Sequence, residues 1–271
     1  MVEPVDATFG TQLRDWRLRR SFSQLGLAAE AEISQRHLSF LETGRAQPSR
    51  QMVLRLAGEL KLPPRSVNAL LAAAGFAPVH RQIDRSDGTV AGIYAGIERL
   101  VHAHAPFPAL AIDRYWNMLF ANVPLLSLME GVDPQLLSGT PNALVISLHP
   151  DGLGPSIANY REWRAHIMHR LHGELAAQPD AQLANLIERI DALPVPAGAA
   201  PWSHSAPRDE DAVALTLRLR LPAGEINLLT ATTQLTTAHD VALSELRLET
   251  FLPADAAASA YFAALQRTIP S

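Results

Sequence analysis

Residues 23–45 have the sequence SQLGLAAEAEISQRHLSFLETGR, a pattern that predicts two short helices joined by a tight turn. Ser23 and Ser34 precede the two helices, where a serine hydroxyl can accept a hydrogen bond from an otherwise unpaired backbone amide. Gly44 follows the second helix as a residue that adopts positive φ without strain. The apolar residues recur at the spacing of a buried helix face: Leu27, Ala28, Ile33, Leu38 and Leu41. We therefore expect a compact pair of packed helices.

The second helix of this pair also carries polar side chains on faces that do not need to be buried. Gln35, Arg36 and Ser39 lie there, together with Phe40. Gln, Arg and Ser are the side chains that hydrogen-bond base edges and phosphates in a DNA major groove. The pattern favours a helix that reads DNA, and an ordinary helical hairpin is the alternative.

Residues 13–62 resemble the XRE, or phage-repressor-like, helix-turn-helix family, which implies a lambda-repressor-like, all-α bundle of five helices over residues 1–80. Four runs carry the resemblance: Phe22-Ser23-Gln24, Ile33-Ser34-Gln35-Arg36-His37-Leu38, Leu41-Glu42-Thr43-Gly44-Arg45 and Pro48-Ser49. The resemblance implies a double-stranded DNA operator as partner, contacted by Gln24, Ser34, Gln35, Arg36, Ser39, Phe40 and Arg45. It also implies a structural ion pair between Arg17 and Glu42. Phe40 stands where the family commonly has a polar residue, and we expect it to touch a thymine methyl or to pack.

Composition and charge bound the class of protein. The 271 residues are 48% hydrophobic and 18% charged, which is typical of one large or two ordinary globular domains. The absence of cysteine excludes disulfides and thiolate zinc sites. Neither a signal peptide nor an apolar run long enough for a membrane span is expected, so we predict a cytoplasmic protein without a membrane partner. The net charge of -4 divides into +4 over residues 1–81 and -8 over residues 82–271, which fits a nucleic-acid-binding front half.

A linker is predicted at residues 79–89, and the chain beyond it mixes helices with short strands. Helices are expected around residues 93–101 and over residues 119–128, 156–177, 181–190 and 255–266. Strands are expected over residues 108–113, 212–221, 225–235 and 244–252, and residues 142–148 fit either a strand or a helical turn. Helices packed on a small antiparallel sheet make an α+β domain over residues 90–271.

Residues 106–265 resemble the MmyB-like ligand-binding domain, which has a PAS-like fold and follows a helix-turn-helix in related regulators. The resemblance is carried by Pro108-Ala109-Leu110, Trp116-Asn117, Leu119-Phe120-Ala121-Asn122, Tyr160-Arg161-Glu162-Trp163, Glu225-Ile226-Asn227-Leu228 and Leu246-Arg247-Leu248. The family's usual His-Pro in the late strands is replaced by Leu221-Pro222. The resemblance implies a pocket for a small, largely apolar, acyl-like ligand, a homodimer contact, or both.

The candidate pocket residues are apolar side chains with a few polar contacts among them: Trp116, Asn117, Phe120, Asn122, Arg161, Trp163, Arg164, Ile167, Leu228, Thr230 and Phe251. Such a sheet often encloses an apolar cavity, and a guanidinium there can meet a carboxylate. The alternative is that the aromatic residues only fill the core.

Other chemistry receives little support from the sequence. His166, His169 and His172 lie at helical spacing, but no carboxylate or cysteine completes a known metal-ligand pattern, so neither a metal nor a cofactor is expected. Ser203-His204-Ser205 and Asp209-Glu210-Asp211 lack a nucleophile motif, and no catalytic residue is expected. The alternative function is a lipid or small-molecule carrier, or an enzyme domain, joined to a helical protein-interaction module.

Overall fold

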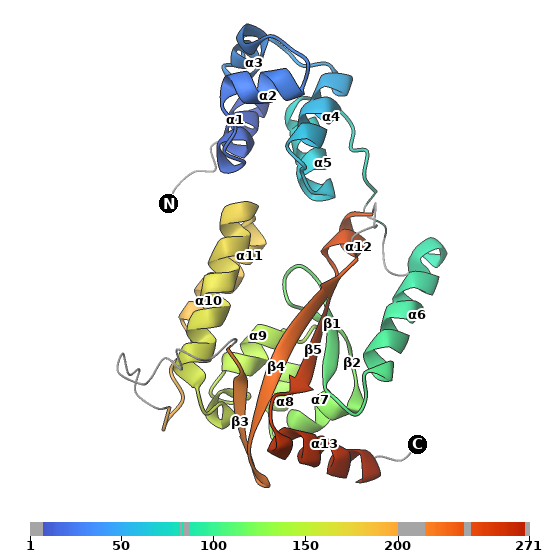
Figure 1. Ribbon diagram of the computed structural model, residues 1–271, viewed down its shortest axis with the longest axis vertical. Helices are drawn as coiled ribbons and strands as arrows, with labels where there is room; N and C mark the ends of the chain where they lie inside the picture. The colour runs from blue at the N-terminus through green and yellow to red at the C-terminus, as the bar shows by residue number, and fades with distance from the viewer. Residues whose placement is uncertain (1–7, 82, 84–86, 200–214, 236–239, 269–271) are drawn as a thin grey trace. The chain divides into compact units, whose positions relative to one another are not determined.

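The computed structural model describes residues 8–81, 83, 87–199, 215–235 and 240–268, which divide by their internal contacts into two compact units (Figure 1). The N-terminal unit comprises Met1–Ile83 together with Thr237–Ser244. The C-terminal unit comprises Asp84–Thr236 together with Glu245–Ser271. Within the described residues, no helix has the length and apolar character that crossing a bilayer would require.

The N-terminal unit contains the predicted bundle of five helices. They are α1 (Phe9–Arg19), α2 (Gln24–Glu30), α3 (Gln35–Glu42), α4 (Arg50–Glu59) and α5 (Pro64–Ala73). The predicted serine caps are present: Ser23 Oγ accepts from the Gly26 amide at 2.9 Å, and Ser34 Oγ accepts from the His37 amide at 3.1 Å. Gly44 follows α3 with φ +73°. The core is built from leucines of all five helices, including Leu13, Leu27, Leu38, Leu41, Leu56 and Leu70.

A short segment from late in the chain completes the N-terminal unit. Asp240 is buried, and its carboxylate accepts from the Ile83 amide at 2.8 Å and from the Leu243 amide at 3.0 Å. The Val241 amide donates to the Arg81 carbonyl at 2.9 Å. These bonds begin the short helix α12 (Val241–Glu245), so the strand expected from residue 244 starts later, at Arg247. The first residues of the predicted strand are helical instead, because the Asp240 carboxylate caps the turn that begins α12.

The C-terminal unit is built on a five-stranded antiparallel sheet in the order β2-β1-β5-β4-β3. The strands are β1 (Ala109–Ile112), β2 (Met118–Ala121), β3 (Leu217–Leu221), β4 (Gly224–Gln234) and β5 (Arg247–Pro253). The α+β class and the antiparallel sheet are confirmed. Four of the five strands were predicted, and the one that was not is β2. Its residues 119–121 were expected to be helical. Pairing with β1 makes them a strand, and the helix begins only after Asn122, whose side chain caps it.

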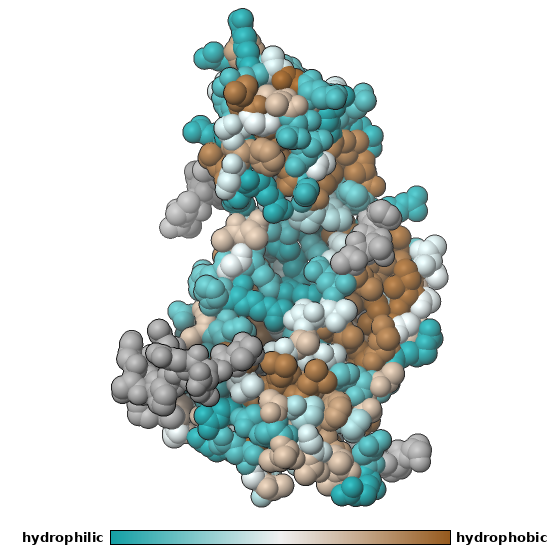
Figure 2. Space-filling view, viewed as in Figure 1, coloured by the Kyte–Doolittle hydropathy of each residue, from teal (hydrophilic) through white to brown (hydrophobic). Residues whose placement is uncertain are grey.

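Helices pack on both faces of this sheet (Figure 1). The helices of this unit are α6 (Gly88–Ala103), α7 (Val123–Leu128), α8 (Pro134–Leu137), α9 (Ala143–Leu148), α10 (Tyr160–Ala177), α11 (Ala181–Asp191) and α13 (Ala256–Thr268). Most of their direct contacts with the strands come from α6, α7 and α13. Helix α6 packs against β1 and β2, and all four residues of β1 are buried because both of its faces are covered. Figure 2 shows an apolar area over α6, where Ile93 and Leu100 are exposed.

Several predicted boundaries shift for local reasons. The segment 142–148, for which both a strand and a helical turn were possible, contains helix α9 at Ala143–Leu148, and the Asn142 side chain caps that helix. Helix α10 begins at Tyr160 rather than at residue 156, since the 3-10 turn Gly154–Ser156 and an isolated bridge from Ile157 to Leu219 precede it. Residues 212–214 of one expected strand, and the segment 203–211, lie outside the described residues.

Candidate nucleic-acid interface and ligand cavity

Helix α3 presents the predicted reading side chains on its surface. Gln35 and Arg36 are exposed at its N-terminal end, and Ser39 and Phe40 are half-buried further along. Arg45 is exposed just after the helix. Figure 2 shows mainly hydrophilic side chains at the end of the N-terminal unit that carries α2 and α3. The arrangement leaves Gln35 and Arg36 free to reach base edges.

The Phe40 ring lies between two guanidinium groups. The Arg36 guanidinium carbon is 5.3 Å from the ring centroid, and that of Arg45 is 6.0 Å from it. A guanidinium within about 6 Å of an aromatic centroid is attracted to the ring face. Phe40 therefore holds two cationic side chains on one surface, a role that the sequence pattern alone did not indicate.

Two other predicted contact residues have structural bonds of their own. The Gln24 amide nitrogen donates to Glu42 Oε2 at 2.8 Å, and Glu42 also receives the Arg17 guanidinium. The ion pair implied by the resemblance is thus present. Ser34 caps α3 through its hydroxyl. Gln24 therefore links α2 to α3, and Ser34 stabilises the start of α3.

The C-terminal unit contains an apolar cavity of about 90 Å³. Six of the predicted pocket residues line it: Trp116, Trp163, Ile167, Leu228, Thr230 and Phe251. The remaining lining is mainly leucine from β1, α7, α9 and the late strands. Ligand pockets commonly measure roughly 300–1,000 Å³, so this cavity suits a small molecule or one end of a larger one.

The other predicted pocket residues are not among those that line the cavity. Asn122 is fully buried and bonds to backbone atoms of Ala109 and Phe107, which makes it a structural cap. Asn117 donates to Asp113 at 2.8 Å in the β1–β2 turn. Arg164 donates to the Asp191 carbonyl at 2.8 Å. The last two residues of this set, on β2 and α10, are Phe120 and Arg161.

Sequence reasoning missed four polar residues that do line the cavity: Ser147, His166, Arg170 and Glu249. His166 and Arg170 follow Trp163 at intervals of one and two helical turns, so the periodicity of α10 carried a usable signal. Glu249 comes from β5 and is buried, and Arg170 donates to it at 2.8 Å. No local pattern connects a strand residue to a helix so far away in sequence.

Trp116 also lines the cavity and contacts one of these polar residues, Arg170. The Trp116 backbone has φ +65°, and its ring lies 4.5 Å from the Arg170 guanidinium and 5.1 Å from that of Arg247. The turn that holds it is closed by Asp113, whose carboxylate accepts from the amides of Tyr115 and Asn117. The cavity therefore combines an apolar wall with a polar side that includes the Arg170–Glu249 ion pair.

Comparison with protein families agrees with this layout. Residues 93–265, more than half of the chain, match the family described as MmyB-like transcription regulator ligand binding domain. The chain belongs to this family of MmyB-like regulators. Residues 8–70 match a helix-turn-helix domain. Both are families of transcription regulators rather than enzymes, so the N-terminal unit of this MmyB-like regulator is a DNA-binding domain. A search of curated proteins found no significant match.

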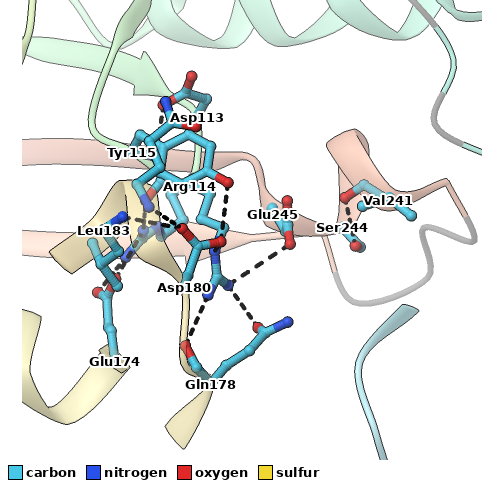
Figure 3. Close-up of polar contacts among 12 residues, drawn as sticks. Asp113, Arg114, Tyr115, Glu174, Gln178, Asp180, Leu183, Val241, Ser244 and Glu245 are labelled. Carbon is cyan, nitrogen blue, oxygen red and sulfur yellow. Dashed lines mark hydrogen bonds and ion pairs between the residues drawn. The ribbon is translucent and has the colours of Figure 1, made fainter. Parts of the chain in front are cut away.

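In this regulator, the turn that holds Trp116 is anchored to the corner between α10 and α11 (Figure 3). Arg114 donates to the Gln178 side chain at 2.6 Å and lies 3.5 Å from the Asp180 carboxylate. Tyr115 donates its hydroxyl to Asp180 at 3.1 Å. Burial raises the pKa of Asp180, but the hydrogen bonds from Leu183, Tyr115 and Gln182 and the charge of Arg114 together lower it by more, so it lies below its ordinary value. The charged carboxylate thus ties the Trp116 turn to the start of α11.

The histidines of α10 do not form a metal centre in the described part of the chain. No group of three or more His, Cys, Asp or Glu there has the geometry to hold a metal ion. Instead, His166 stacks on Trp163 with ring centroids 5.8 Å apart. Loss of solvation lowers the pKa of His166, and the positive charge of Arg170 lowers it further. The neutral imidazole is therefore favoured at the cavity.

Proposed function

We propose that this regulator inserts α3 into the major groove of a double-stranded operator and binds it as a homodimer. We further propose that a small, largely apolar, acyl-like ligand in the C-terminal cavity changes its affinity for DNA. The observation that carries the first proposal is the exposure of Gln35 and Arg36 on α3, beside the guanidinium of Arg45. A regulator that reads operator DNA acts where the chromosome is, which in a bacterium is the cytoplasm.

The DNA contacts follow from the chemistry of these side chains. Gln pairs best with adenine and Arg with guanine in the major groove, each through two hydrogen bonds. Arg45 lies beyond the helix end, where a cation suits a phosphate better than a base edge. We assign Gln35 and Arg36 to base reading, Ser39 to either role, and Arg45 to the backbone.

The homodimer follows from the limited reach of one helix. A single recognition helix contacts too few base pairs for operator-level discrimination, so such domains bind two half-sites about 10 base pairs apart. The C-terminal unit is the natural source of the dimer contact, because the N-terminal unit then keeps α3 free. Sedimentation of the full chain with and without its operator measures this directly.

The ligand proposal rests on the cavity. Its apolar lining favours an alkyl or acyl group, and its volume of about 90 Å³ favours a short one. A ligand changes DNA affinity only if it binds the DNA-competent and DNA-free states unequally. Effector control is therefore a thermodynamic coupling, measured as the ratio of operator affinities with and without ligand.

Selection of bound DNA from a random pool, followed by sequencing, tests the function as a whole. We expect an enriched sequence with two-fold symmetry and half-sites one helical turn apart. Enrichment of no sequence would contradict base reading by α3. Native mass spectrometry of the purified chain tests the ligand proposal, because a small molecule bound in stoichiometric amount would be identified by its mass.

The carrier alternative remains distinguishable by experiment. A carrier would exchange its cargo equally well with and without DNA, whereas an effector-controlled regulator shows a cargo affinity that operator DNA changes. Titration of the identified cargo in the presence and absence of operator therefore separates the two functions.

A further inference from the structure

Helix α12 begins in one unit of the chain and ends in the other. Its residues 241–244 belong to the N-terminal unit, whereas Glu245 belongs to the C-terminal unit. The helix lies in the connection between β4 and β5, two strands that both contribute residues to the cavity lining. The Ser244 amide donates to the Asp240 carbonyl at 3.0 Å, which closes the helical turn. A hydrogen-bonded turn moves as one body, so the two ends of α12 are mechanically connected.

The start of α12 is fixed to the linker that follows the five-helix bundle. Asp240 is buried, and its carboxylate accepts from the Ile83 amide at 2.8 Å and from the Leu243 amide at 3.0 Å. The Val241 amide donates to the Arg81 carbonyl at 2.9 Å. Hydrogen bonds to a charged acceptor are stronger than those between neutral groups. A displacement of α12 therefore displaces the linker at these positions.

The end of α12 is held by the turn that carries Trp116 (Figure 3). Arg114 Nη1 lies 3.7 Å from Glu245 Oε1, and both side chains are only 12% exposed. Arg247, the first residue of β5, donates to the Arg114 carbonyl at 3.1 Å. Salt screens partly buried ion pairs much less than exposed ones. Arg114 therefore binds both the last residue of α12 and the start of the strand that follows.

The same turn lines the cavity. Trp116, two positions after Arg114, is a lining residue, and its ring lies 4.5 Å from the guanidinium of Arg170, which also lines the cavity. Trp116 has φ +65°, a strained conformation for a bulky residue and one that is found at switch regions. Packed interiors have low compressibility and transmit strain. A change in the contents of the cavity therefore acts on the turn that holds Glu245.

We propose that α12 transmits the state of the cavity to the DNA-binding unit. Arg114 and Glu245 are positioning residues at its end, and Asp240 fixes its start to Ile83. The inference rests on the proposed effector control and deepens it by naming the element that couples the two units. A ligand that shifts the Trp116 turn changes the Arg114–Glu245 pair, and the resulting shift of α12 changes the hydrogen bond at Ile83. The strength of the control equals the difference in ligand affinity between the two positions of α12.

Amide hydrogen exchange in the full chain tests this transmission without a ligand or an operator. Arg114→Met removes the partner of Glu245 at one end of α12, and NMR follows the Ile83 amide at the other end. We expect this amide to exchange about fivefold faster, the effect of weakening roughly one hydrogen bond. Arg164→Met is the matched control, because it removes another half-buried arginine of the C-terminal unit, one that donates to Asp191. It should leave the exchange rate of the Ile83 amide unchanged.

Further variants separate transmission from a general loss of stability. Arg114→Lys keeps a cation beside Glu245 and should restore part of the wild-type rate at Ile83. If Arg114→Met does not fold, Glu245→Gln removes the charge of the pair with little change in shape and carries the same expectation. Equal rates at Ile83 in Arg114→Met and Arg164→Met overturn the inference. An increase that the amides of α4 share also overturns it, because the whole N-terminal unit is then opening.

The consequence for DNA binding is measured with the cavity filled by the protein itself. Ala143 lines the cavity, and Ala143→Leu adds an isopropyl group there. The affinity of this variant for an operator selected from random DNA should differ from that of the wild type by about fivefold or more. Asp240→Ala in the same chain should remove the difference. Leu128→Phe fills the cavity from α7 and provides a second variant with the same expectation.

The outcomes separate the two levels of the proposal. A change in operator affinity that persists in full in Asp240→Ala overturns transmission through α12 and leaves effector control standing. Unchanged affinity in both cavity-filling variants contradicts effector control, and the inference falls with it. A change that requires Asp240, together with the response of Ile83 to Arg114→Met, supports both.

Discussion

The Arg17 guanidinium donates two hydrogen bonds to the Glu42 carboxylate, at 2.5 and 3.0 Å, and joins α1 to α3 inside the N-terminal unit. The side chains are 8% and 2% exposed, so water does not screen the pair. The hydrogen bond to Glu42 raises the pKa of Arg17 against the opposing effect of burial. Arg17 also donates to the Phe22 carbonyl at 2.9 Å. The helix that presents Gln35 and Arg36 is thus held at its far end by a buried ion pair.

Removal of one partner of this pair should be costly. Glu42→Ala leaves the Arg17 charge buried and uncompensated, with an expected loss of about 3–5 kcal/mol in the free energy of unfolding of the N-terminal unit. Hydrogen exchange of amides in α1 and α3 measures this loss. The exposed pair Arg218–Glu225 is the control, because its removal should cost only about 0–1 kcal/mol. Equal effects at the two pairs would contradict the assigned structural role.

Gly10 should not tolerate alanine, although alanine is the better helix former. A Cβ at this position would lie 2.5 Å from the Glu42 carbonyl oxygen and 2.6 Å from that of Leu41. Gly10→Ala should therefore destabilise the N-terminal unit by about 1–3 kcal/mol, since α1 and α3 must move apart. Gly58→Ala is the matched control in α4, where a Cβ meets nothing within 4 Å. Helix propensity alone then predicts a gain of roughly 0.5–1 kcal/mol.

Operator affinity should depend on the two exposed residues at the start of α3. Gln35→Ala and Arg36→Ala should each weaken operator binding by about 1–3 kcal/mol, measured by mobility shift at fixed salt. Arg220→Ala removes an exposed cation from the C-terminal unit and should leave affinity unchanged. If Arg36→Ala weakened binding to all DNA sequences equally, Arg36 would be a phosphate contact and not a base reader.

Phe40 should support DNA binding through the guanidiniums that it holds. Phe40→Leu removes the ring face and should weaken operator binding by about 0.5–1 kcal/mol for each of Arg36 and Arg45. Phe40→Tyr keeps the ring and should bind as the wild type does. A loss confined to one A·T position of the operator would instead identify a thymine methyl contact.

The Asp180 carboxylate should make the C-terminal unit sensitive to acid. Its folded-state pKa is depressed, so its contribution to stability is present above its unfolded value and is lost as the pH falls through the folded value. The stability difference between the wild type and Asp180→Asn should therefore be largest near neutral pH and shrink below about pH 4. Urea unfolding at a series of pH values measures it. A difference that stays constant down to pH 2 would show that charge is not the cause.

The helix-turn-helix was predictable because its signals are local. Ser23, Ser34 and Gly44 set the ends of α2 and α3 within a few residues of themselves, and the leucines repeat at helical spacing. Even here the pattern left the side chain of Phe40 undecided between packing and a base contact. Its place between two arginines depends on Arg45, which lies beyond the end of the helix.

The cavity was only partly predictable. Trp163 and Ile167 followed from the periodicity of α10, and the same periodicity could have found Arg170. Residues 119–121 were mistaken for helix because a short apolar run fits either structure, and only its pairing with β1 decides between them. Asn122 was predicted to contact a ligand, but its side chain hydrogen-bonds to backbone atoms that the fold brings to it.

The sequence by itself determined the bundle of five helices, the exposed polar residues at the start of α3 and the α+β class of the second unit, because caps, turns and periodicity act over a few residues. Only the tertiary structure decided which charges surround Trp116. The packing of α10 on β5 brings together Arg170, Glu174, Arg247 and Glu249. The ion pairs between the helix and the strand depend on distance in space and not on spacing in the chain. The balance of those charges arises only once the chain has folded.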